Sequence, residues 1–342
     1  ALPRGCQARR VRDRRDLRSL LRPRRLGRRD EEAEGARVDR RRPVQHLPDD
    51  PWPGGDAGGL RERDPAGVLG SGGVDANDEA RRRWDSAASG WEAERELLAA
   101  VNAPVTETLV AALAAGPNDT VLDLAGGTGD LAEALAGRVA LVISTDLSPA
   151  MVEAARRREL PDVEHRVMDL QAIDLPDASV DAVVCRFGYM LVPDPALALR
   201  ETRRVLRPGG RLAFATWAPA ARNPWASAYG PALIERGLQD PPAPSDPGQF
   251  ALAEPDLIEA LVRAAGFAEV AVEEVPVEYR FSDWNGYRRV VTGLAASLRA
   301  KLQSLPAEVR AEIDEAARER IEHFHCDAGY LLPGLALVTV AR

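Results

Sequence analysis

The sequence predicts an α/β protein with a Rossmann-like, doubly wound sheet, and three observations carry this prediction. Short apolar runs alternate with segments of helical spacing through the middle of the 342-residue chain. A glycine-rich turn follows the first of these runs, and acidic residues stand at the ends of the first three. Continuous apolar runs are typical of parallel strands covered on both faces, and their alternation with helices predicts consecutive βαβ units.

The first predicted strand covers residues 121–124 and leads directly into the turn AGGTG, residues 125–129. Residues 131–135 follow with helical spacing and no helix breaker. Glycines let the backbone approach a ligand closely, and the start of a helix presents unpaired N–H groups. The turn is therefore the predicted centre of a ligand site.

The acid in the first strand, Asp123, distinguishes between two ligands for this turn. Gly127, Gly129 and Ala132 fit the G-x-G-x-x-G/A spacing of a dinucleotide turn, and Asp146 follows Gly129 by 17 residues. A carboxylate beside the turn would repel a pyrophosphate, however, and would attract a ligand with an ammonium and a sulfonium. S-adenosylmethionine has both cations, so it is the expected cofactor, with a nicotinamide dinucleotide as the alternative.

The second predicted strand, residues 140–145, ends at Asp146. A carboxylate there can accept hydrogen bonds from both hydroxyls of a ribose. In the following DLSPAM segment, Ser148 is the expected N-cap of a helix. Leu147 and Met151 are assigned to the cofactor site, with Met151 against the adenine face; a lone methionine is otherwise more often a core residue.

The fourth predicted strand, residues 180–186, places a loop at its carboxyl end. Ligands of open α/β sheets bind outside the carboxyl ends of the strands. Arg186 and Phe187 are therefore expected at the cofactor, Gly188 at a close approach, and Tyr189 near the reacting groups as a candidate catalytic residue.

The segment LDLAGGTGDL resembles the first cofactor motif of the class I methyltransferases, in particular the ubiquinone/menaquinone C-methyltransferases and their small-molecule relatives. The run LRETRRVLRPGGRLAFATW resembles the block before and through their fifth strand, and the resemblance covers roughly residues 120–217. It implies a seven-stranded sheet whose last strand is antiparallel, and transfer of a methyl group to a small-molecule acceptor by in-line displacement.

The resemblance also implies roles for single residues. Asp123, with Ala125, Gly127 and Gly129 of the turn, would hold the methionine end of the cofactor. Asp169, after the third predicted strand at residues 163–168, would meet the adenine amino group. The backbone amide of Leu170, the next residue, would meet a ring nitrogen of the adenine. Ala125 stands where glycine is usual, a change that costs little if its φ angle is negative.

Segments on either side of this block are expected to enclose the site. Residues 77–115 have two helical patterns, in which Trp84 and Trp91 share a face, as in a helix that closes over the cofactor; core packing is the alternative. Residues 218–253 and 282–330 are expected as substrate-cap insertions, with helices over 284–303 and 306–325 and a last strand at 335–341. His325 and Tyr330 of the second insertion are candidates for a general base.

Charge and composition limit the classes of partner that the protein is expected to bind. Residues 1–83 hold 21 Arg against 15 Asp and Glu, which leaves 24 basic and 38 acidic residues in the rest from totals of 45 and 53. Residues 1–75 show no lasting apolar periodicity and are expected to be disordered or a spurious extension, and the domain to span 76–342. The acidic body argues against nucleic acid, and the absence of a run of 18 apolar residues argues against a membrane span.

Three cysteines without a CxxC pair argue against a zinc site and a disulfide framework, and favour a cytoplasmic location. No metal is expected, and the sequence leaves a monomer and a homodimer open. Two rival functions stay open as well: a quinone-pathway C-methyltransferase, and a protein that binds S-adenosylmethionine without turnover.

Overall fold

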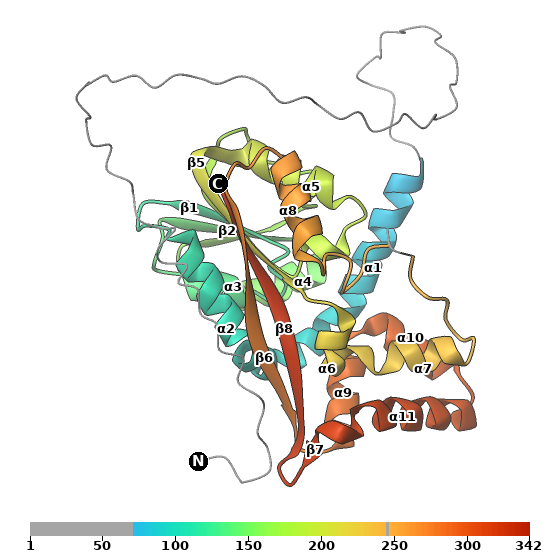
Figure 1. Cartoon of the computed structure of the whole chain (residues 1–342). Helices are drawn as coiled ribbons and strands as arrows, with labels where there is room; N and C mark the ends of the chain where they lie inside the picture. The colour runs from blue at the N-terminus through green and yellow to red at the C-terminus, as the bar shows by residue number, and fades with distance from the viewer. Residues whose placement is uncertain (1–70, 244–245) are drawn as a thin grey trace, which may run out of the picture. The chain divides into compact units, whose positions relative to one another are not determined.

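The computed structural model describes residues 71–243 and 246–342 (Figure 1), so the expectation for residues 1–70 lies outside the described residues. One mixed sheet organises this part of the chain. Its strands are β1 (Thr120–Leu124), β2 (Leu141–Asp146), β3 (Val163–Val167), β4 (Val180–Arg186), β5 (Leu206–Trp217), β6 (Val270–Phe281), β7 (His325–Cys326) and β8 (Gly329–Ala341).

The strand order is β3-β2-β1-β4-β5-β8-β6, with β7 paired to β8. Strands β1 to β5 are parallel, and β8 runs antiparallel between β5 and β6. The order reverses between β1 and β4, which places the carboxyl ends of these strands at the switch point where such sheets bind ligands. The predicted doubly wound sheet with an antiparallel last strand is confirmed; the two-residue β7 is an addition.

Helices cover both faces of the sheet. Helix α2 (Arg95–Leu113) packs on β4, β5, β6 and β8, next to α3 (Asp130–Leu135), whereas α5 (Pro195–Val205) and α8 (Pro255–Ala264) pack on the opposite face (Figure 1). Helix α4 (Pro149–Arg156) packs on β2 and β3. By length and composition α2 could span a membrane. In this fold its apolar stripe lies on the sheet, and coverage of both faces explains why β1 reads as an apolar run.

The hairpin of β6 and β8 extends well past the end of β5. Trp217, the last residue of β5, pairs with Ala336, and β6 and β8 stay paired as far as Phe281 and Tyr330. These six further residues of β8 correspond to roughly 20 Å of strand. The last strand is therefore longer than expected, and its additional length carries chain away from the parallel sheet.

Several helices lie on one side of this overhanging hairpin and are here called the cap helices (Figure 1). They are α6 (Pro224–Ser227), α7 (Tyr229–Glu235), α9 (Trp284–Leu294), α10 (Ala296–Ser304) and α11 (Ala307–Ile321), followed by a 3-10 turn (Glu322–Phe324). The helix expected over 284–303 is interrupted at Ala295, whose φ of −103° and ψ of 86° are not helical. The helix expected over 306–325 ends at Ile321, and His325 lies in a strand instead.

Two other local expectations differ from the structure. The segment RPGG, expected to close a helix, forms the beginning of β5, with Gly209 at a φ of 80°. The first helix, α1, spans Ser71–Ala93 and so begins before the expected domain start at residue 76.

Candidate active site

The turn after β1 alternates between left-handed and ordinary backbone. Ala125, Gly127 and Gly129 have φ angles of 53°, 56° and 88°. The expectation that Ala125 has a negative φ is therefore wrong, and its Cβ adds a steric cost of about 1–2 kcal/mol. Gly188 leaves room for this methyl group, because a Cβ at Gly188 would lie 2.7 Å from the Cβ of Ala125.

Asp123 lies beneath this turn and is fully buried. Its Oδ2 accepts a hydrogen bond from the Ser144 hydroxyl at 2.9 Å, whereas its Oδ1 has no partner among the described residues. A Cβ at Gly126 would lie 2.6 Å from the same Oδ2, so the backbone above the carboxyl must be bare. Burial raises the pKa of Asp123 to about 7, although the Ser144 hydroxyl opposes the rise.

Asp146, at the end of β2, connects two loops at the sheet edge. Its Oδ2 accepts from the Gly127 amide at 3.0 Å, and its Oδ1 accepts from the Ser148 amide at 2.9 Å. Burial raises the pKa of Asp146 to about 6, against the effect of these amides. Each carboxylate oxygen has more than one lone-pair position, so both oxygens can accept a further hydrogen bond.

Helix α1 crosses the strand ends and bonds to them. The side-chain amide of Asn77 donates to Asp169 Oδ2 at 2.8 Å, and Asp169 Oδ1 accepts from the backbone amide of Gln171 at 2.8 Å. Further along α1, Asp85 Oδ1 accepts from the Ser148 hydroxyl at 2.5 Å and from the Ala150 amide at 3.1 Å. The helix is thereby fixed over the ends of β2 and β3.

Met151 is buried in a small cluster under α1 that also contains Ala87, Ala88 and Ala296, with Trp84 and Trp91 packed against it. Trp84 and Trp91 are in edge contact, with ring centroids 6.0 Å apart, so the predicted shared face is confirmed. Leu147 is half-buried and Leu170 is buried. Met151 therefore lies under α1, whereas Leu147 and Leu170 directly follow Asp146 and Asp169 in the chain.

Arg186, at the end of β4, is engaged by neighbouring helices. Its guanidinium donates to the Thr106 hydroxyl of α2 at 2.7 Å and to Asp130 Oδ2, at the start of α3, at 3.1 Å. Asp130 also pairs with Arg158. Arg186 therefore links the glycine turn to α2.

Phe187 begins a series of aromatic contacts that the sequence analysis did not identify. Its φ is 68°, unusual for a bulky residue, and its ring stacks on Trp217 at 4.1 Å. Trp217 contacts Trp225 at 5.0 Å, and Trp225 stacks on Tyr279 at 4.1 Å. These four residues, here called the aromatic wall, connect the end of β4 to β6. The alternation of aromatic and polar residues near the end of β6 was the sequence pattern from which part of these contacts could have been predicted.

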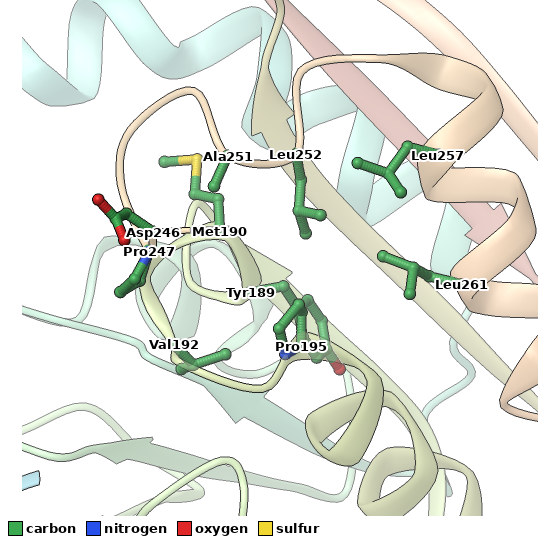
Figure 2. A pocket seen from close by; sticks show the side chains of 10 residues that line it. All are labelled: Tyr189, Met190, Val192, Pro195, Asp246, Pro247, Ala251, Leu252, Leu257 and Leu261. Atoms are coloured by element: carbon green, nitrogen blue, oxygen red, sulfur yellow. The ribbon is translucent and has the colours of Figure 1, made fainter. Parts of the chain in front are cut away.

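Tyr189 does not lie where a catalytic residue would be needed. It is fully buried, and its hydroxyl lies 2.5 Å from the Thr202 hydroxyl of α5. Burial raises the pKa of Tyr189 well above its ordinary value. Figure 2 shows its ring in the lining of a small apolar pocket between the 246–252 segment and α8. The catalytic role of Tyr189 stays a prediction, and the burial of its ring and the contact of its hydroxyl with Thr202 argue against it.

His325 and Tyr330 lie at the tip of the β6–β8 hairpin beside β7 (Figure 1). Tyr330 is about 20 Å of strand beyond Ala336, the residue level with the end of β5. The Tyr330 hydroxyl donates to Glu322 at 2.9 Å, and His325 is exposed with its ring 4.8 Å from that of Tyr330. Neither residue reaches the glycine turn, so this distance argues against the general-base role, which stays a prediction.

Acids at the ends of three successive parallel strands, around a glycine turn and under a covering helix, define an S-adenosylmethionine-dependent methyltransferase of class I. The orphaned Oδ1 of Asp123 and the bare backbone at Gly126 are suited to a cationic ligand that approaches closely.

Comparison with known proteins agrees. A family model described as a methyltransferase domain matches residues 122–214. The demethylmenaquinone methyltransferase of Clavibacter sepedonicus is 34% identical over 201 residues, which are 55% of this chain and 81% of that protein. The chain belongs to the class I S-adenosylmethionine-dependent methyltransferases, and S-adenosylmethionine is its cofactor.

A second relative and one solved structure are also similar to this chain. The demethylmenaquinone methyltransferase of Renibacterium salmoninarum is 32% identical over 174 residues, which are 48% of this chain and 73% of that protein. Among solved structures, the YcgJ protein of Bacillus subtilis is 18% identical, with a TM-score of 0.48 over 69% of this chain and 97% of that chain.

Proposed function

We propose that this methyltransferase methylates a small-molecule acceptor held between the ends of the parallel strands and the cap helices. The observation that carries the proposal is the aromatic wall, which leads from Phe187 beside the glycine turn to Tyr279 on β6. An apolar and aromatic lining with few polar groups is typical of sites for small organic molecules. Residues 218–253 and 282–330 would act as the substrate cap.

Specific residues would hold the cofactor. Asp123 and the turn of Ala125, Gly127 and Gly129 would face its methionine end, Asp146 its ribose and Asp169 its adenine. Both oxygens of Asp146 already accept backbone amides, so the ribose hydroxyls would use the remaining lone pairs. Leu147, Met151 and Leu170 would contact the adenine, and Phe187 would lie near the transferred methyl group. Arg186 would act indirectly, because its guanidinium is bonded to Asp130 and Thr106.

When bound, S-adenosylmethionine supplies a methyl group on a sulfonium, which is an excellent leaving group. The protein's contribution is then mainly orientation, because positioning of two reactants can supply much of the rate acceleration. The buried carboxyl of Asp123 fixes one end of the cofactor, α1 excludes water over the strand ends, and the aromatic wall orients the acceptor. An acceptor with an acidic hydroxyl or carbon would lose its proton to solvent or to a basic group of the acceptor itself.

A quinone-pathway acceptor is the second candidate, and the names of the two demethylmenaquinone methyltransferases favour it. A reduced naphthoquinone is flat and aromatic, which suits the aromatic wall. We expect methyl transfer from radiolabelled S-adenosylmethionine to menadiol if this candidate is right. Transfer to phenols or amines but not to menadiol would leave the broader proposal standing. Release of no S-adenosylhomocysteine with any acceptor would favour a binding protein without turnover.

Cofactor contacts are tested by calorimetric titration with sinefungin, a stable analogue of S-adenosylmethionine. Asp146→Ala should weaken binding by at least about 1 kcal/mol, the scale of a lost hydrogen bond to a charged group. Asp174→Ala is the matched control, because Asp174 is an exposed aspartate to which no role in the site is assigned. Equal affinity in Asp146→Ala and the wild type would contradict the assignment of Asp146.

A further inference from the structure

One side chain on α2 is buried with an unsatisfied polar atom, although no role has been given to it above. Asn102 is 4% exposed, and its Oδ1 has no hydrogen-bond partner among the described residues. It lies on the helix face that otherwise consists of apolar residues, between Leu98 and Val105. A buried carbonyl without a partner destabilises a protein by about 1–3 kcal/mol, so such atoms are rare in native structures.

The direction of α2 places Asn102 toward the carboxyl ends of the strands. The guanidinium of Arg211, at the amino end of the parallel part of β5, bonds to the carbonyls of Leu113 and Ala114 at the end of α2. Thr106 receives the Arg186 hydrogen bond at the carboxyl end of β4. Helix α2 therefore runs antiparallel to these strands, and Asn102 lies one turn, about 6 Å, beyond Thr106 in the direction of the carboxyl ends of β4 and β5.

The aromatic wall lies on the strands that α2 covers. Helix α2 packs on β5, which ends at Trp217, and on β6, which carries Tyr279. Burial raises the pKa of Tyr279, and the charge of Arg186, which precedes Phe187 in the chain, opposes this rise. Asn102 lies one turn from Thr106 on the same face of α2, and Thr106 bonds to Arg186, the residue before Phe187 of the aromatic wall.

We propose that Asn102 is an acceptor-recognition residue, whose carbonyl oxygen accepts a hydrogen bond from a hydroxyl or amine on a flat aromatic acceptor. The inference rests on the proposed function and adds the chemical class of the acceptor to it. The aromatic wall would stack the ring system, and the carboxamide would select the orientation that presents the donor. A site built to pair with a donor rejects analogues that lack it, because its own buried acceptor then stays unpaired.

A matched pair of probes tests this. 2-Naphthol and 2-methoxynaphthalene have the same ring system, but only the first donates a hydrogen bond. Both are measured by equilibrium dialysis against the full-length protein saturated with sinefungin. The wild type should bind 2-naphthol about five- to tenfold more tightly, the equivalent of one net hydrogen bond.

Asn102→Leu should remove this preference by weakening 2-naphthol binding, with unchanged affinity for 2-methoxynaphthalene and for sinefungin. The variant should fold, since leucine has the same number and branching of side-chain heavy atoms and removes a buried polar group that has no partner. Asn118→Leu, at an exposed position before β1, is the control and should keep the wild-type preference.

Each other outcome overturns the inference in a defined way. If the wild type binds neither naphthalene, the acceptor is not a flat aromatic molecule. If it binds both equally, or if Asn102→Leu keeps the preference, Asn102 is satisfied by water and does not recognise the acceptor. If the wild type does not bind sinefungin, the proposed function itself is contradicted. This outcome is therefore distinguishable from a failure of the inference about Asn102.

Discussion

Replacement of the buried acid Asp123 by asparagine should make the protein more stable while it weakens cofactor binding. The Ser144 hydroxyl can donate to an asparagine Oδ1 as it does to the carboxylate, so the substitution removes little except the charge. The pKa of Asp123 is about 7 in the fold, against an ordinary value of 3.8 for an exposed aspartate. Each pKa unit corresponds to about 1.4 kcal/mol, so the ionised carboxylate destabilises the empty site by about 4 kcal/mol at pH 8.

The sign of the pH dependence follows from the same two values. Below about pH 4 the group is protonated in both the folded and the unfolded chain, and the charge has no effect on stability. Between pH 4 and pH 7 the unfolded chain loses its proton first, so the wild type loses stability as pH rises. Asp123→Asn does not titrate. Its advantage should therefore grow from about 2 kcal/mol at pH 5.5 to about 4 kcal/mol at pH 8.

Urea denaturation of the cofactor-free wild type and of Asp123→Asn at these two pH values measures the effect, with the exposed Asp174→Asn as control. Sinefungin affinity at pH 8 should fall at least about tenfold in Asp123→Asn, since a unit charge some 6 Å away contributes about 3 kcal/mol at an effective dielectric constant of 20. Equal stability of the two proteins at pH 8, or an advantage that does not change with pH, would refute the reasoning.

Other predictions concern the contacts around this acid. Gly188→Ala should lower the free energy of unfolding by about 1–3 kcal/mol, because the new Cβ would lie 2.6 Å from a sulfur and 2.7 Å from the Cβ of Ala125. Ala125→Gly alone should stabilise by up to about 1 kcal/mol in a denaturant titration, and it should restore part of the loss in the double variant. Asp85→Ala removes two hydrogen bonds between α1 and the start of α4, and we expect faster amide hydrogen exchange in α1 with severalfold weaker sinefungin binding; unchanged exchange would show that α1 is held by other contacts. Trp217→Leu removes the ring on which Phe187 stacks, so methyl transfer should slow while sinefungin affinity stays the same, and equal loss of both would place the stack in the cofactor site.

The sequence predicted the parallel part of the sheet and the acids at its strand ends, because these features depend on local patterns. The apolar run before Ala125 could only be a covered strand, and the acids that end three such runs share one sheet edge. The left-handed backbone at Ala125 was not predictable, since it depends on the absence of a Cβ at Gly188, a residue distant in sequence.

Candidate catalytic residues were chosen by residue type, which carries no information about the long-range pairing that decides their position. Tyr189 follows the loop directly, yet a hydroxyl on α5 and the packing of its ring draw it into the core. His325 and Tyr330 belong to an insertion whose distance from the site depends on the register of β8, and that register cannot be read from the insertion itself. Asn102 was missed because a single polar residue on an apolar helix face gives no periodic signal.

The overhanging hairpin separates two kinds of evolutionary change in this molecule. Helices α9 to α11 leave β6 after Phe281 and return to β8 by way of β7, so the whole excursion can be lengthened, shortened or exchanged without altering any residue at the parallel strand ends. Relatives that share the donor machinery could therefore diverge in what they methylate by grafting different helical excursions onto the same pair of strands.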